Sequence, residues 1–190
     1  MFTLTIRNEV LSTHAYYAEL MIQSGIAKHS FQRLKEYARV QIDRDYNAKI
    51  DRPKTSIEVV CDCNLFLSSA AAISKLLFPS DRAAQTAKNR AMELRENIGV
   101  NDLTVLRSRN VRNSFEHTDE RIDELLKTMG NADLCQIHIA NKPPVSEFVL
   151  KRFNPATMEI SFLNRQVDTQ ACIEEINELD QGIKWAMSNA

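Results

Sequence analysis

The chain has 190 residues, with 24 lysines and arginines against 25 aspartates and glutamates, and a formal net charge of −1. This length suits one domain with a sizeable core. The balanced charge excludes a protein that coats nucleic acid or anionic membrane through bulk charge alone. The 4 glycines and 5 prolines argue against turn-rich β architectures, so we expect a mainly helical fold.

The first half of the chain has the hydrophobic spacing of helices. Apolar residues recur every three or four positions from about residue 8 to residue 50, with a possible break at Gly25. Pro53 ends this section, and Thr55 or Ser56 can cap the apolar helix that extends to Phe78. Charged and polar residues interrupt that helix, which indicates a buried helix of a soluble bundle rather than a membrane span.

Two further helices are expected before the spacing of apolar residues changes at Gly130. The first covers about residues 82–97, with Ser80 or Asp81 as its cap, and ends at Gly99. The second begins at Asn101 or Asp102 and continues without a break to Met129.

After Gly130, apolar and polar residues alternate over residues 135–139 and again over 158–162. This period of two predicts short antiparallel strands, which form a β-hairpin-like insert at about residues 134–165. Apolar spacing then predicts a last helix over about residues 169–187. The expected fold is a single domain over residues 1–190, an antiparallel helical bundle with a small antiparallel β element before the C-terminal helix.

The four cysteines lack the spacing of a disulfide framework or a zinc site. The side chains of Cys61 and Cys63 would point about 200° apart on a helix, so they cannot coordinate the same metal ion. Unpaired thiols favour a reducing compartment, and the N-terminus lacks the long apolar stretch of a signal peptide. We therefore expect a cytoplasmic protein without a metal ion, a cofactor or a membrane partner.

The informative segment lies within the helix expected over residues 102–129. At roughly 100° per residue, a helix here places its apolar side chains in one stripe and its polar ones on the opposite face. The core-facing stripe contains Val111, Phe115, Thr118, Ile122, Leu125, Leu126 and Met129. The polar face contains Arg109, Arg112, Asn113, Glu116, His117 and Glu120.

These polar residue types can cleave RNA without a metal ion. Arg112 can hold a phosphate bidentately. His117 can exchange a proton near neutral pH, to activate a ribose 2′-hydroxyl or to protonate the leaving oxygen. Asn113 can orient His117 or the scissile phosphate. Arg107 and Arg109 are candidates for contacts to RNA phosphates, and Glu116 can pair with Arg112 or raise the pKa of His117.

The stretch Arg112-Asn-Ser-Phe-Glu-His117 resembles the Arg-polar-x3-His motif of the HEPN superfamily (higher eukaryotes and prokaryotes nucleotide-binding). The resemblance implies a helical bundle and a metal-independent endoribonuclease of a toxin, defence or RNA-processing system. It also implies a homodimer whose two motifs form one cleft, and an antitoxin or another protein as a partner. Some family toxins are modified on a Tyr two positions after the His, where this chain has Asp119.

Two other interpretations of the same residues stay open. The first is a non-catalytic helical module that binds a protein or nucleic acid, in which Arg112 and Glu116 form an ordinary i,i+4 pair on a solvated helix face. The second is a small-molecule enzyme with a metal in the bundle core. The second has little support, because the chain contains no Glu-x-x-His motif.

Overall fold

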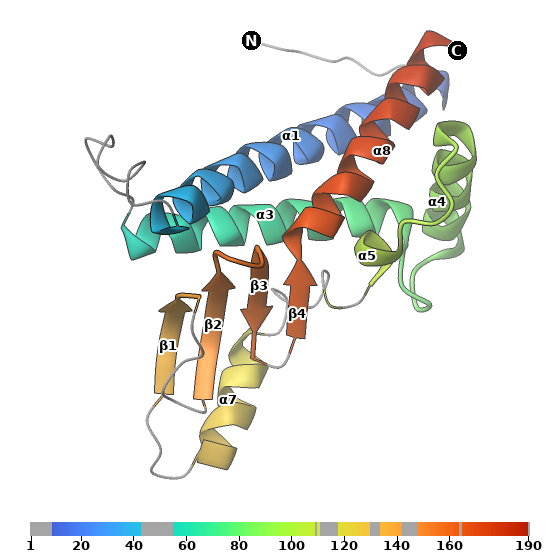
Figure 1. Ribbon diagram of the computed structural model, residues 1–190. Helices are drawn as coiled ribbons and strands as arrows, with labels where there is room; N and C mark the ends of the chain where they lie inside the picture. Colours follow the sequence, from blue (N-terminus) through green and yellow to red (C-terminus); the bar gives the residue numbers. More distant parts are fainter. Residues whose placement is uncertain are drawn as a thin grey trace.

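The computed structural model describes residues 9–42, 55–108, 110, 118–129, 134–141, 148–163 and 165–189 (Figure 1). Within these residues the fold is mainly helical with a small sheet before the last helix, as expected from the sequence. The helices are α1 (Glu9–Ile42), α3 (Ser56–Leu77), α4 (Gln85–Ile98), α5 (Thr104–Arg107), α7 (Thr118–Met129) and α8 (Thr169–Ser188). The strands are β1 (Leu134–Ile139), β2 (Phe148–Asn154), β3 (Glu159–Phe162) and β4 (Arg165–Asp168).

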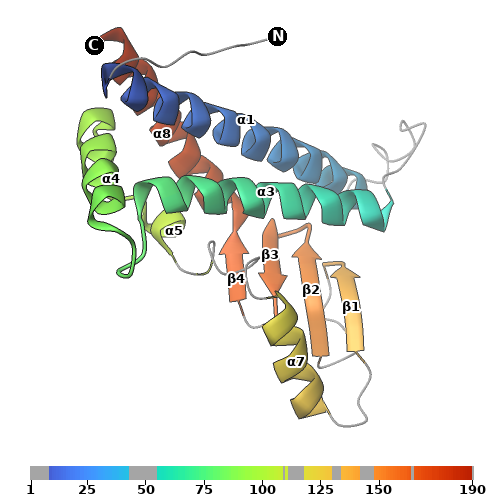
Figure 2. The ribbon, with the colours of Figure 1, turned by 180° about the vertical axis from the view of Figure 1, so that it is seen from behind.

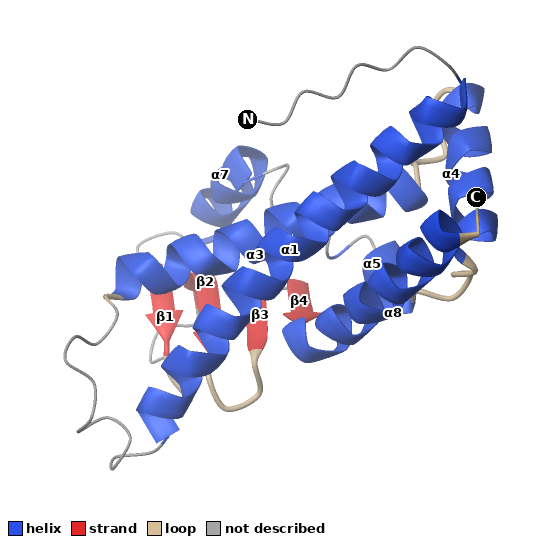
Figure 3. Cartoon of the chain, turned by 90° about the horizontal axis from the view of Figure 1, so that it is seen from above, coloured by secondary structure: helices blue, strands red, loops and turns tan. Residues whose placement is uncertain are grey.

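In the view of Figure 1, the long helix α1 lies above α3, α8 crosses in front of them, and the sheet lies below α3. Seen from above, α1 crosses over α3, and α8 runs beside them (Figure 3). The expected break at Gly25 is wrong, because α1 continues through it. One glycine weakens a helix by only about 0.5–1 kcal/mol, whereas α1 buries Leu20, Ala27 and Leu34 along one side.

The start of α3 is determined by local chemistry, and the sequence predicted it correctly. The Thr55 hydroxyl accepts a hydrogen bond from the Glu58 backbone N–H at 3.3 Å, and the Glu58 carboxylate accepts one from the Thr55 backbone N–H at 2.7 Å. This reciprocal capping box satisfies donors that the first helical turn leaves free. By length and composition α3 alone among the described helices could cross a membrane, and half of its most apolar stretch is buried.

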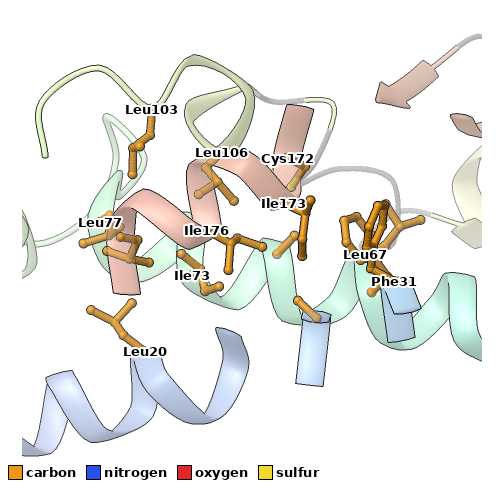
Figure 4. Packing of buried hydrophobic residues seen from close by; sticks show 14 of the residues in the cluster. Leu20, Phe31, Leu67, Ile73, Leu77, Leu103, Leu106, Cys172, Ile173 and Ile176 are labelled. Atoms are coloured by element: carbon orange, nitrogen blue, oxygen red, sulfur yellow. The ribbon is translucent and has the colours of Figure 1, made fainter. Parts of the chain in front are cut away.

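The hydrophobic core lies where α1, α3, α5 and α8 meet (Figure 4). Phe66 of α3 is completely buried, and its ring lies 6.3 Å from that of Phe31 on α1. Two ion pairs tie the core helices together at its edge: Arg33 Nε lies 2.9 Å from the buried Asp62 carboxylate, and Lys28 pairs with Asp180 of α8. The apolar faces of α1, α3 and α8 are therefore buried in one cluster, and the two ion pairs hold the helices together beside it.

The C-terminal end of α4 packs closely against α8 at Gly182. A Cβ added to Gly182 would lie 2.5 Å from Ile98 Cγ2 and would also collide with the Ile98 carbonyl oxygen. We expect Gly182→Ala to lower the free energy of unfolding by about 1–3 kcal/mol, because the two helices must separate to admit the methyl group. Urea unfolding followed by circular dichroism measures this difference.

Gly25 provides the matched control in α1, because nothing lies within 4 Å of a Cβ added there. Gly25→Ala should therefore raise the free energy of unfolding by about 0.5–1 kcal/mol through better helix propensity. A neutral or stabilising Gly182→Ala would contradict the close approach of α4 and α8.

The N-terminus of α4 differs from the expectation. The helix begins at Gln85 after Ala84, which makes no side-chain cap, so neither Ser80 nor Asp81 caps it. The Ser80 carbonyl instead accepts a hydrogen bond from the Ala83 N–H at 2.9 Å, and this turn delays the helix. At the other end, Gly99 has the left-handed φ of 73° of a helix C-cap, as predicted.

The uninterrupted helix expected over residues 102–129 is wrong. The four-residue α5 ends at Arg107, and Ser108 has an extended conformation with φ −59° and ψ 137°. A second helix, α7, begins at Thr118 and lies beside the sheet, apart from the core helices (Figure 2). Leu126 of the predicted core-facing stripe is exposed, and the half-buried Ile122 and Leu125 are outside the core cluster.

The sheet is mixed, with the strand order β1-β2-β3-β4. The predicted strands at 135–139 and 158–162 correspond to β1 and β3, but the expected all-antiparallel arrangement is wrong because β1 runs parallel to β2. Eight residues separate Ile139 from Phe148. A chain spans about 3.3–3.6 Å per residue, so this connection can return along the strand. β2, β3 and β4 pair antiparallel.

Candidate functional site

Five of the six predicted site residues lie outside the described residues: Arg109, Arg112, Asn113, Glu116 and His117. The structure describes the sixth, Arg107, as the exposed last residue of α5. It also describes both flanks of the motif, where Asn110 is helical and α7 begins at Thr118.

A carboxylate on α8 holds α5 in place. Glu175 accepts hydrogen bonds from the backbone N–H groups of Val105 and Leu106, both at 2.8 Å, and from the Thr104 hydroxyl at 3.2 Å. These N–H groups belong to the first turn of α5, where no intrahelical acceptor exists. A negative charge at this end also matches the helix dipole. Together with the buried Leu106, Glu175 fixes the chain just before the motif.

We expect Glu175→Gln to lower the free energy of unfolding by about 1.5–3 kcal/mol, because charge-assisted bonds to two N–H groups are lost. The amides of Val105 and Leu106 should exchange their hydrogens faster in the variant. Hydrogen exchange followed by NMR measures this local effect. Glu178→Gln is the matched control, since that side chain is exposed on the same helix. Unchanged protection of both amides would show that Glu175 does not hold α5.

Ser108 redirects the chain between α5 and the motif. Its extended ψ of 137° ends the helix, and its side-chain oxygen accepts a hydrogen bond from the Asn110 backbone N–H at 3.1 Å. A serine that bonds the N–H two positions later is typical of a helix start. Ser108 therefore interrupts the single continuous helix in which the sequence pattern had placed Arg107.

An open cleft of about 240 Å³ lies next to Ser108. It lies between the α5–Asn110 segment and the edge strand β4, and is lined by Thr104, Val105, Ser108, Asn110, Gln166, Val167 and Asp168. The Asp168 carboxylate is already engaged, accepting bonds from the N–H groups of Gln170 and Ala171 at 2.9 and 3.0 Å. The other polar side chains of the lining are the hydroxyls of Thr104 and Ser108 and the amides of Asn110 and Gln166, and the described lining contains no lysine or arginine.

Sequence reasoning missed Glu175, Gln166 and the hydroxyls of the cleft. No local pattern distinguishes them, because α5 and β4 lie about 60 positions apart in the chain and meet only in the fold. Glu175 could not be recognised from the sequence either, because glutamate is common on the exposed sides of helices.

The three described histidines do not gather into another site. His14 contacts the Tyr17 ring with a centroid separation of 6.1 Å, His29 is exposed on α1, and His138 is half-buried on β1. In the part of the chain that the structure describes, no three His, Cys, Asp or Glu side chains lie close enough to hold a metal ion. Burial raises the pKa of the Cys172 thiol, which keeps it protonated and unreactive.

Comparison with known proteins finds no family model, curated protein or solved structure that matches this chain.

Proposed function

We propose that this protein is a metal-independent endoribonuclease of HEPN type, in which Arg112 and His117 carry the chemistry. The observation that carries the proposal is the stretch Arg112-Asn-Ser-Phe-Glu-His117. Two features of its surroundings support it: helical residues flank the motif on both sides, and the cleft beside β4 includes Asn110, two positions before Arg112.

The reaction begins with attack of a ribose 2′-hydroxyl on the adjacent phosphorus. One His117 side chain accepts the 2′-hydroxyl proton as the new O2′–P bond forms. The bond from phosphorus to the 5′-oxygen breaks, and a second imidazole, in its protonated form, donates a proton to that oxygen. Arg112 stabilises the negative charge on the non-bridging oxygens, and Asn113 orients His117 or the phosphate.

The use of one imidazole as base and a second as acid implies a homodimer. One His117 per subunit cannot readily act as base and acid in the same step, whereas two copies can share the roles. Arg107 and Arg109 then contact neighbouring phosphates, and Glu116 pairs with Arg112 across one helical turn. A cytoplasmic location and an antitoxin or other protein partner belong to the same proposal.

Paired oligonucleotides of one sequence, as RNA and as DNA, test this proposal in the presence of a metal chelator. The protein should cleave the RNA and leave the DNA intact, because only RNA carries the 2′-hydroxyl nucleophile. Sedimentation of the same sample should give a dimer. RNA that is bound but never cleaved would favour a non-catalytic helical module, and a strict requirement for metal would overturn the mechanism.

A further inference from the structure

A second cavity lies farther along the sheet from the cleft beside β4. It has a volume of about 110 Å³ and lies between the first half of α3 and the strands β1, β2 and β3. Its apolar wall includes Val60, Leu67, Ile139, Phe153, Ile160 and Phe162. Protein interiors normally pack without such voids, so space remains between the helix layer and this part of the sheet.

Two cations of β2, Lys151 and Arg152, belong to the lining of the cavity. Lys151 of β2 pairs in register with Ile137 on one side and Phe162 on the other, and all three line the cavity. Its ammonium nitrogen lies 5.9 Å from the centre of the Phe162 ring. Among the described residues, no carboxylate contributes to the lining. Alternation along the strand places the side chains of Lys151 and Arg152 on opposite faces of the sheet, and only Lys151 shares the face of Ile137 and Phe162.

We propose that this cavity binds a small monocarboxylate with an aliphatic chain, whose carboxylate pairs with Lys151. The apolar wall removes the chain from water, and the half-buried ammonium selects an anionic end over a neutral or cationic one. A dry cavity of about 150 Å³ accommodates benzene. A space of 110 Å³ that opens at the exposed side of Ile137 therefore suits the end of a short chain.

The probe for this proposal is hexanoate, compared with hexan-1-ol and hexylamine by isothermal titration calorimetry on the full chain. Hexanoate should bind with a dissociation constant in the millimolar range, as expected for a ligand of this size, and hexylamine should not bind. Lys151→Met should weaken hexanoate by about tenfold and leave hexan-1-ol unchanged. Lys184→Met, which removes an exposed lysine from α8, should change neither.

A second variant tests the location. Ile137 is 42% exposed at the edge of the cavity, so Ile137→Trp can extend over the opening without entering the core. Hexanoate binding should disappear in this variant while its circular dichroism spectrum stays unchanged. The proposal is overturned by equal binding of hexanoate and hexylamine, by no binding of any probe, or by full hexanoate affinity in Ile137→Trp. None of these outcomes depends on ribonuclease activity.

Discussion

His117→Ala should reduce the rate of RNA cleavage by about 10²–10⁴-fold, the contribution usual for a positioned acid or base. Arg112→Ala should have an effect of similar size, because the transition state loses its charged partner for the phosphoryl oxygens. Both variants should fold normally and still bind RNA through their other cations. Single-turnover cleavage of a labelled RNA, with chelator present, measures the chemical step separately from binding.

The controls replace the same residue types elsewhere. His29→Ala removes an exposed histidine from α1, and Arg82→Ala removes an exposed arginine before α4. Both should cleave at the rate of the unchanged protein. Cleavage that survives His117→Ala would show that another residue or a contaminating nuclease does the chemistry.

The second large effect concerns stability. Phe66→Ala should lower the free energy of unfolding by about 3–5 kcal/mol, because it removes a large side chain and leaves a cavity in the core. Phe66 has no exposed surface, and it packs against Phe31 where α1 meets α3. Urea unfolding of the variant and of the unchanged protein gives the difference.

Leu65 is the matched control because it precedes Phe66 on the same helix and is 50% exposed. Leu65→Ala should change the free energy of unfolding by no more than about 0.5 kcal/mol, the usual range for surface positions. Similar losses for Phe66→Ala and Leu65→Ala would contradict the orientation of α3, and with it the position of the core.

Elements with local signals were predictable from the sequence. Thr55 and Glu58 are three residues apart and form a cap by themselves, and Gly99 ends α4 through its own left-handed conformation. Asp168 caps α8 in the same local way, close to where apolar spacing placed the start of the last helix. Each depends on contacts within one helical turn, which sequence patterns record well.

Features that depend on distant partners were not predictable. The start of α5 depends on Glu175, which lies 70 positions from Val105. Likewise β1 pairs parallel with β2, and the alternation of apolar residues does not encode the direction of a strand. The candidate site likewise combines a local sequence pattern with contacts between distant residues. The motif at Arg112 and His117 is visible in the sequence, while the cleft beside Asn110 exists only once α5 and β4 meet.

The chemical ends of the RNA fragments test the central claim most directly. Attack by the 2′-hydroxyl must leave a 2′,3′-cyclic phosphate on one fragment and a 5′-hydroxyl on the other. Mass spectrometry of fragments produced in chelator identifies both ends, and His117→Ala should yield neither. Fragments with 3′-hydroxyl and 5′-phosphate ends would contradict the account, because they require attack by water instead of the ribose hydroxyl.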